Sequence, residues 1–330
     1  MDGREASPFC LSCAGLGCAY LMATVLSISV PFFTVIFLGM FTRAIGFFQR
    51  ADARTLSKFA FYVTVPPMLF VNLADKNPAQ MLNWGFIWRF ELATLVVLLS
   101  SAVIASRLFG LSRSESGMFG LSAAYPNYGY MGIPLGILTF GDAAAVPLAV
   151  ILFVDSILLF GFAAIAVSGR GTGWIATSAS VLRTMAKNPF LIAITASFVF
   201  SASGIEMPLF IDRVLSLLAG AATPVALFAL GVTVFGQSLR SSVGELLGIS
   251  LFRLILHPLL VALLFLGLPG VDPLWIKIAI MSACLPVAAN VFVVANNYGA
   301  YSVQSASATL VTTIAASLTV PLYLYWALSL

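Results

Sequence analysis

Prolines and glycines break an apolar stretch of the chain that is long enough to cross a bilayer. Residues 122–142 read SAAYPNYGYMGIPLGILTFGD, with Pro126, Gly129, Gly132 and Pro134 in the interior. Hydrocarbon offers the backbone no hydrogen-bond partners, so a break at membrane depth is tolerated only beside protein or a water-filled cavity. This break is therefore the first candidate for a binding site.

A second broken stretch lies near the C-terminus and resembles the first. Residues 282–300 read SACLPVAANVFVVANNYGA, which repeats the S-A-x-x-P opening and again has a later glycine. The start of a half-helix carries unpaired N–H groups that attract anions, whereas the end of the other half-helix carries unpaired C=O groups that attract cations. If the two breaks cross, one small pocket would offer both polarities without a formal charge.

Each break also carries a neutral amide. Asn127 directly follows Pro126, and Asn290 lies four residues after Pro286. Either asparagine alone could form a hydrogen bond between packed helices, but the pair beside two breaks suits a carboxylate headgroup. The expected binding site consists of Pro126, Asn127, Gly132, Pro286 and Asn290.

Three ionisable residues inside apolar stretches are candidates for coupling. Asp155 lies within AVILFVDSILLFGF, where a carboxylate is expensive and by default functional. We expect it either to carry a proton or coordinate a cation, or to hydrogen-bond to the neighbouring broken helix. Arg253 and His257 are four residues apart and share a helix face. The alternative to coupling is that Arg253 extends to the nearby membrane surface and that His257, the single histidine, serves packing.

The composition indicates a polytopic membrane protein. The 330 residues are 61% hydrophobic and 8% charged, and the mean hydropathy is +1.05, whereas soluble domains are about 25% charged. The net charge of +4 does not predict a nucleic-acid partner, because the Lys and Arg residues lie in short loops, where they set membrane orientation.

No motif predicts an enzyme or a resident cofactor. Gly169 to Gly173 is glycine-rich but lacks the Lys-Ser/Thr of a Walker motif, and neither metal-ligand spacing nor a G-x-S-x-G nucleophile elbow is present. A coupling ion, H⁺ or Na⁺, stays open. The four cysteines have no second pair or nearby histidine, so we expect small apolar residues that face lipid at Cys10, Cys13, Cys18 and Cys284.

Ten transmembrane helices are predicted, because each span needs about 20 mostly apolar residues. They run at approximately 28–47, 55–74, 84–108, 117–140, 143–168, 189–205, 212–236, 246–268, 273–297 and 302–328. Residues 1–27 resemble a signal peptide or an extra helix but show no clear small-x-small cleavage site, so they are taken as an N-terminal extension, with an eleventh helix as the alternative. Arg89 and Glu91, near the outer end of the third span, are expected to anchor at the interface.

Basic residues predict the orientation. Ten Lys and Arg residues fall in odd-numbered loops, against four in even-numbered loops and the N-terminal tail. The excess places the odd loops in the cytoplasm and both termini outside. The longest loop, 169–188, would then connect two five-helix units on the cytoplasmic side, 28–168 and 189–330.

These two units repeat the same landmarks in the same order. The matched pairs are separated by 157, 160 and 158 positions, for Pro67 and Pro224, Pro126 and Pro286, and Gly141 and Gly299. A unit of five spans is odd, so the second copy must enter the membrane upside down relative to the first. Inverted repeats with a broken helix at the same place in each half are typical of secondary transporters with a midplane site.

The first broken stretch resembles the auxin efflux carrier family. Tyr125-Pro126-Asn127, Met131-Gly132-Ile133-Pro134-Leu135 and Phe140-Gly141-Asp142 are similar to the P-N-x-x-x-M-G-I-P-L and Y/F-G-D pattern of that family's first crossover helix. Residues 285–299, 187–189 and 224–231 also fit, so the resemblance extends from about Ser29 to the C-terminus.

The resemblance implies ten helices in two inverted repeats, with crossed fourth and ninth helices and carboxylate binding at the crossing. It also implies a fold related to bile-acid transporters and sodium/proton antiporters, a scaffold of spans one, two, six and seven, elevator-type motion of the others, and a homodimer. The family's carboxylate-binding asparagine corresponds to Asn127, and its helix-breaking prolines to Pro126 and Pro286.

Two departures distinguish the chain from the plant hormone carriers. Val291 stands where those carriers have a further proline, and only residues 168–188 replace their long cytoplasmic loop. The chain is more similar to short bacterial members, which are associated with malonate and other small carboxylates. We therefore expect a carrier of a small organic anion in the inner membrane, with a sodium-coupled bile-acid-type symporter, a channel, or an enzyme using Asp155, His257 or Cys284 as alternatives.

Overall fold

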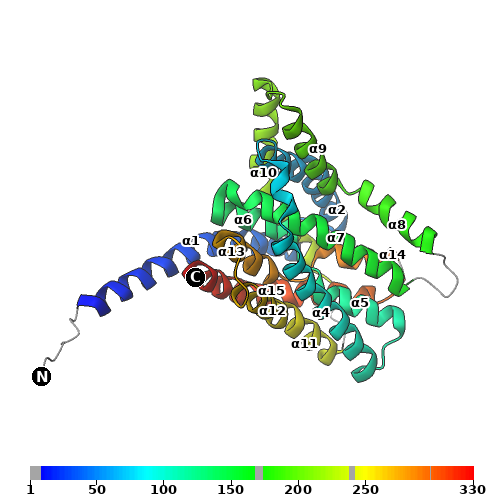
Figure 1. Cartoon of the computed structure of the whole chain (residues 1–330). Helices are drawn as coiled ribbons and strands as arrows, with labels where there is room; N and C mark the ends of the chain where they lie inside the picture. Colours follow the sequence, from blue (N-terminus) through cyan, green and yellow to red (C-terminus); the bar gives the residue numbers. More distant parts are fainter. Residues whose placement is uncertain (1–8, 168–173, 238–241, 298) are drawn as a thin grey trace, which may run out of the picture.

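The structure is a computed structural model that describes residues 9–167, 174–237, 242–297 and 299–330 (Figure 1). Within these ranges the chain is helical and contains no strand. The helices of the N-terminal half are α1 (Phe9–Ala44), α2 (Arg50–Phe59), α3 (Val65–Leu73), α4 (Trp84–Leu108), α5 (Arg113–Ala124), α6 (Ile133–Phe140) and α7 (Ala145–Val167). The remaining helices are α8 (Trp174–Ala186), α9 (Pro189–Ser203), α10 (Leu209–Val234), α11 (Val243–Leu251), α12 (His257–Leu266), α13 (Pro273–Ala283), α14 (Ala289–Asn297) and α15 (Ser302–Ser329).

Short turns of other helix types join several of these elements. The π-helical turns Ala60–Thr64 and Phe252–Leu256 connect α2 to α3 and α11 to α12, and a third, Tyr128–Gly132, leads into α6. At all three joints a proline is the second residue of the next helix, Pro66, Pro134 or Pro258, a position near a helix start where proline is tolerated.

Seven helical stretches of the described chain are long and apolar enough to cross a membrane, instead of the ten expected. They are Ala19–Ala44, Ala51–Leu73, Trp84–Leu108, Tyr128–Ala166, Leu209–Val234, Val243–Leu266 and Ser302–Ser329. Two of the other expected spans, 117–140 and 273–297, are divided by the breaks, and the third corresponds to α9, which has only 15 residues. The prediction of a helical, multi-pass membrane protein is confirmed.

The first helix is longer than predicted. Residues 9–44 form one continuous helix that passes through Pro31, so no separate eleventh helix precedes the first span in the described residues. Figure 1 shows the N-terminal turns of α1 projecting away from the bundle. The side chains of Cys10, Cys13 and Cys18 lie outside the described part of the structure, so the expectation for them stays a prediction.

A pair of glycines allows α1 and α10 to approach closely. A Cβ atom at Gly39 would lie 2.3 Å from the carbonyl oxygen of Phe228, and one at Gly231 would lie 2.0 Å from that of Ile36. Small residues at such a crossing let two membrane helices pack backbone to backbone. The α1–α10 contact therefore depends on the absence of side chains at these two positions.

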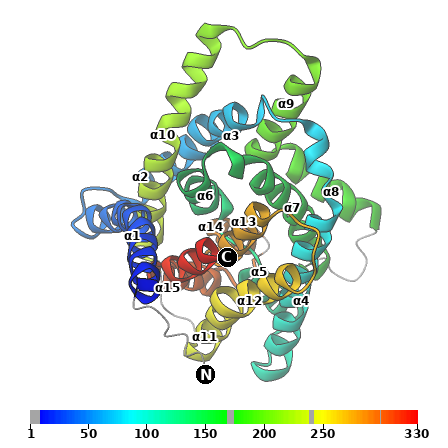
Figure 2. The same ribbon diagram turned by 60° about the vertical axis from the view of Figure 1, so that its left-hand side comes forward.

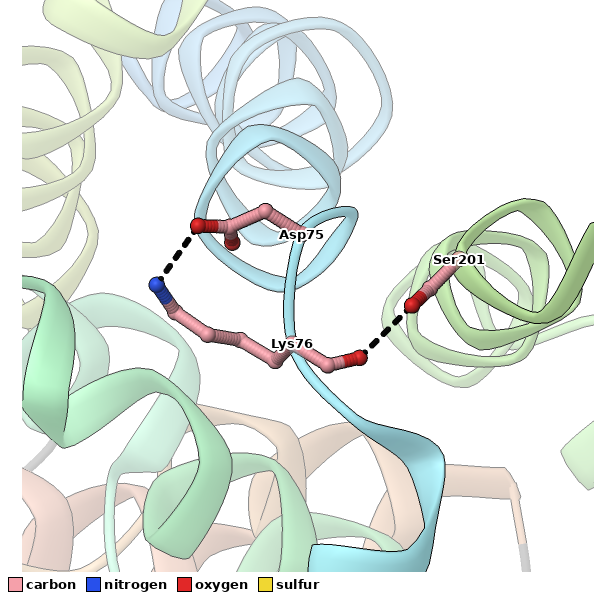
Figure 3. A network of polar contacts seen from close by, with 3 residues as sticks. All are labelled: Asp75, Lys76 and Ser201. Carbon is pink, nitrogen blue, oxygen red and sulfur yellow. Dashed lines mark hydrogen bonds and ion pairs between the residues drawn. The ribbon is translucent and has the colours of Figure 1, made fainter. Parts of the chain in front are cut away.

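Helix α10 also packs against α2 and α3, and α3 packs against α9. At the end of α3, the hydroxyl of Ser201 in α9 donates a 2.7 Å hydrogen bond to the carbonyl oxygen of Lys76 (Figure 3). Lys76 also forms a 2.9 Å ion pair with Asp75, whose side chain is largely exposed, so this pair adds little stability. These contacts join α1, α2, α3, α9 and α10 into one group of helices.

The two breaks lie between this group and a second one. In the second group, α4 packs against α5 and α12, α5 against α7, and α15 against α13 and α14. Figure 2 shows α6, α13 and α14 near the centre, with α1 and α10 on one side and α4 and α7 on the other. The residues that the sequence singles out are therefore held between two sets of packed helices.

Candidate functional site

The two breaks lie side by side and exchange backbone hydrogen bonds. Pro126 and Val287 form an isolated antiparallel bridge. The N–H of Asn127 donates to the carbonyl oxygen of Pro286 at 2.9 Å, and the N–H of Ala288 donates to that of Tyr125 at 3.0 Å. Each unwound segment thus satisfies polar backbone groups of the other, which is what a break in an apolar environment requires.

Asn127 caps the turn that follows the first break. Its Oδ1 accepts a hydrogen bond from the N–H of Tyr130 at 3.3 Å, and its carbonyl oxygen accepts from Met131 and Gly132. The side chain is 2% exposed, and its Nδ2 has no hydrogen-bond partner. A buried amide donor without a partner costs free energy, so this group is available to an acceptor that enters the site.

A small pocket of about 10 Å³ lies beside Asn127. Its lining residues include Asn127, Ser156, Asn188 and Asn290, together with Pro126. Such a volume holds about one water molecule. Three asparagines therefore surround a space that is closed to anything larger in this conformation.

A larger cavity lies next to the closed pocket and shares Asn290 with it. It has a volume of about 640 Å³ and is lined by Tyr130, by polar residues of α14, and by residues of α1 and α2 at the first predicted loop, here called loop one. Three of the lining residues are basic: Arg43, Arg54 and Lys58. The cavity thus extends from the basic side of the protein to one of the two site asparagines.

Two of the five expected site residues support the pairing rather than line the pocket. A Cβ atom at Gly132 would lie 2.9 Å from Cδ1 of Leu285, so the glycine gives the second break room to approach. Pro286 contributes its carbonyl oxygen to Asn127. Sequence reasoning did not assign Asn188 and Ser156 to the site, although Asn188-Pro189 has the same Asn-beside-Pro pattern as Pro126-Asn127.

Asp155 is fully buried and bonds to the first broken segment. Its Oδ2 accepts a 2.7 Å hydrogen bond from the phenol hydroxyl of Tyr128, and its Oδ1 has no partner. At the second break, the N–H of Val287 donates to Oγ1 of Thr312 at 3.1 Å. In both cases a polar side chain on the next long helix, α7 or α15, holds the unwound segment.

Arg253 does not extend to the membrane surface, contrary to one of the two expectations for it. Its side chain is fully buried. Nη1 donates a 2.7 Å hydrogen bond to the carbonyl oxygen of Ala124, and Nη2 lies in hydrogen-bond contact with the carbonyl oxygen of Ala283 and with Nδ1 of His257. The guanidinium does not reach the membrane surface because it is bound to carbonyl groups at the C-terminal ends of α5 and α13.

His257 is buried beside Arg253 and uses both ring nitrogens. A guanidinium has only donors, so Nδ1 accepts from Arg253, and the proton is on Nε2, which lies 3.2 Å from Oγ1 of Thr94. Neither Arg253 nor His257 lines the pocket beside Asn127. The structure therefore places Arg253 and His257 outside the pocket, whereas Asp155 bonds to Tyr128, one of the pocket residues.

Two further residues are held within the protein. Arg89 is 6% exposed and donates to the carbonyl oxygen of Pro269, between α12 and α13, at 2.7 Å, and its position at the membrane interface stays a prediction. Cys284 is fully buried and donates to the carbonyl oxygen of Met281, so it does not face lipid. In the described residues no cluster of three His, Cys, Asp or Glu side chains could hold a metal ion.

Comparisons with known proteins relate the chain to membrane transporters. Residues 24–171 and 174–324 match the sequence model of a family described as "Membrane transport protein". A protein of Rhizobium meliloti (strain 1021) named "Putative malonate transporter" is 33% identical over 309 residues, which cover 92% of this chain and 96% of the relative. "Uncharacterized transporter YfdV" of Escherichia coli (strain K12) is 24% identical and covers 90% of this chain and 95% of its own length.

Proposed function

The chain belongs to the auxin efflux carrier family of membrane transport proteins, and from this premise we propose that it is a secondary-active carrier of small organic carboxylates, such as malonate or an auxin-like acid. The family and the names of the relatives describe transporters and not enzymes. The proposed substrate follows from the chemistry of the site and from the name of the Rhizobium meliloti relative.

The observation that carries the proposal is the buried, unpartnered Nδ2 of Asn127. It lies at the start of the Tyr128–Gly132 turn, and Asn290 lies in the first turn of α14. Helix starts favour negative charge, and a hydrogen bond to an ionised acceptor is about twice as strong as a neutral one. A carboxylate between the two asparagines would satisfy the free amide donor and both helix starts.

The 640 Å³ cavity supplies a route to this site. Its lining residues Arg43, Arg54 and Lys58 lie in α1 and α2, at the side of the protein that we propose to be cytoplasmic, and their charge attracts anions. The pocket beside Asn127 is too small for a carboxylate here, so binding requires the breaks to separate slightly. We propose that alternating access opens the same site to the other side of the inner membrane, with both termini outside.

The proposed architecture is ten helices in two inverted repeats with crossed breaks. The paired breaks support it, as do Asp155 and Thr312, which occupy matching places on the helices that follow the two breaks. The grouping of α1, α2, α3, α9 and α10 supports a scaffold against which the other helices move as an elevator. Between the two groups of helices, the ring centre of Phe61 lies 4.7 Å from the ring centres of both Phe190 and Tyr130. A homodimer stays a prediction.

Transport by purified protein in vesicles tests the proposal. We expect saturable uptake of labelled malonate, and Asn127→Ala should raise KM about 10- to 100-fold, since a hydrogen bond to a charged group contributes about 1.5–3 kcal/mol. Asn72→Ala is the matched control, because the Asn72 amide bonds within its own helix, to Met68. Uptake of carboxylates by Asn127→Ala at the wild-type KM would refute the site.

A further inference from the structure

The side chain of Arg253 connects the C-terminal ends of the two half-helices that precede the breaks. Ala124 is the last residue of α5 and Ala283 is the last residue of α13, and the guanidinium donates to both carbonyl oxygens. The last carbonyl groups of a helix have no partner within it and carry its partial negative charge. Arg253 thus binds the negative ends of both half-helices at once.

We propose that Arg253 is a built-in counter-ion that occupies the place of a coupling cation, so that the carrier requires no sodium. Carbonyl oxygens at the ends of broken membrane helices are the groups with which transporters coordinate Na⁺. Here those oxygens are already bound by a guanidinium, which stays charged and has no acceptor. A tethered cation of this kind cannot be released in a transport cycle.

The neighbours of Arg253 agree with a cation site and not with an ordinary ion pair. In the described part of the chain, Lys76 and Asp75 form the ion pair that is close enough for direct contact, and Arg253 has no carboxylate at that distance. Its partners within hydrogen-bond distance are two backbone carbonyl groups and a neutral imidazole. The buried carboxyl group of Asp155 is near enough to act on the charge of Arg253, but its Oδ2 accepts a hydrogen bond from Tyr128 and not from the guanidinium. Burying an arginine costs several kcal/mol, which the helix ends must offset.

His257 acts here as a positioning residue. Its Nδ1 accepts from Nη2 of Arg253, and its Nε2 contacts Oγ1 of Thr94 in α4. The ring therefore fixes the direction of the guanidinium and links it to a third helix. Protonation of His257 would place two cations side by side, so the neutral ring belongs to this arrangement.

Thermal unfolding of the purified full chain in detergent, without substrate, tests the inference. Wild-type protein should have the same Tm in NaCl and in choline chloride of equal ionic strength. Arg253→Met removes the charge but keeps an apolar stem, so its Tm should fall by several degrees in choline chloride, and NaCl or LiCl should restore at least half of the loss. Arg253→Lys keeps a cation, so its Tm should not depend on sodium.

Arg89→Met is the matched control. Arg89 is also buried and donates to a backbone carbonyl, that of Pro269, but it lies away from the breaks, so its loss should lower Tm equally in both salts. A sodium-specific rise in the Tm of wild type or of Arg253→Lys would overturn the proposal. So would an Arg253→Met protein that folds and responds to sodium no more than Arg89→Met. If Arg253→Met does not fold, the Tm values of wild type and of Arg253→Lys in the two salts decide whether the proposal stands.

The transport part of this inference rests on the proposed function, whereas the unfolding assay does not. In vesicles, wild-type uptake of malonate should be equal with sodium and with choline outside, and a sodium-dependent rate would contradict the inference. If no carboxylate is transported but Arg253→Met gains sodium-dependent stability, the proposed function fails and the counter-ion assignment stands.

Discussion

The phenol hydroxyl of Tyr128 donates a 2.7 Å hydrogen bond to Oδ2 of Asp155, although 27 residues separate the two along the chain. Tyr128 is the first residue of the turn after the first break, and Asp155 lies on α7. This bond occupies Oδ2, whereas Oδ1 has no partner at hydrogen-bond distance, and Thr94 of α4 also interacts with the carboxyl group. Asp155 therefore holds the broken segment, and we propose that it also carries a coupling proton.

Asp155→Asn separates these two roles. The amide keeps an acceptor for Tyr128 but cannot exchange a proton, so we expect malonate exchange between two equal pools to remain and accumulation driven by a pH gradient to disappear. Tyr128→Phe is the comparison, because it removes only the bond and should lower stability by about 1–3 kcal/mol. If Asp155→Asn leaves both malonate exchange and pH-driven accumulation unchanged, the role of Asp155 is structural alone.

Gly231→Ala should strongly destabilise the protein. The new Cβ atom would lie 2.0 Å from the carbonyl oxygen of Ile36 and 2.9 Å from the N–H nitrogen of Met40, so α1 and α10 would have to separate. Thermal unfolding in detergent measures the effect.

Gly220→Ala in the same helix is the control for Gly231→Ala. No atom lies within 4 Å of a Cβ at this position, and alanine is about 1 kcal/mol better than glycine inside a helix. We expect an unchanged or higher Tm. Equal losses in both variants would show that the close α1–α10 approach does not matter for stability.

Reversing charge in the 640 Å³ cavity should weaken substrate capture from that side. In Lys58→Glu, we expect a higher KM for malonate entering from the side of loop one, and the difference from wild type should shrink at high salt, because exposed charges are screened within about 8 Å at physiological ionic strength. Lys76→Glu is the control, since Lys76 lines a different cavity. A salt-independent change in Lys58→Glu would argue against electrostatic attraction.

The start of α5 should show a pH-dependent stability. The N–H of Ser112 donates to Oε2 of Glu115 at 3.0 Å, and the bonds with Ser112 lower the pKa of Glu115 below its ordinary value of 4.5. Because the folded pKa is the lower one, this stabilisation is complete above pH 4.5 and is lost as the pH falls below it.

Ser112→Ala removes the side-chain half of this capping box. The loss of an N-cap costs about 0.5–2 kcal/mol, so we expect a lower Tm than wild type at pH 7 and a smaller difference at pH 4. A difference in Tm that is constant with pH would show that Glu115 does not contribute.

The sequence located both breaks, because Pro126 and Pro286 interrupt apolar stretches that lipid would otherwise require to be helical. It did not reveal what Arg253 binds, since an arginine near the end of a span has the same local pattern whether it reaches the surface or the ends of two distant helices. Ser156 was missed because the sequence argument stopped at its neighbour Asp155, and only the packing of α7 against the breaks brings the serine to the pocket.

Hydropathy measures the length of an apolar stretch but not the continuity of its hydrogen bonds. The prolines therefore located the breaks in 117–140 and 273–297, but the residues at which each half-helix ends came only from the structure. In the same way, no residue between Phe9 and Ala44 marks where the membrane begins, and one helix formed where an extension and a span were expected.

Asn290 lines both the open cavity and the closed pocket, whereas Asn127 lines only the second. A carboxylate arriving from the loop-one side would therefore meet the two amides in sequence, first Asn290 and then Asn127. If the proposed site is correct, we expect the two asparagines to govern different rate constants: Asn290 the rate at which an arriving anion is captured, and Asn127 the time for which it is retained.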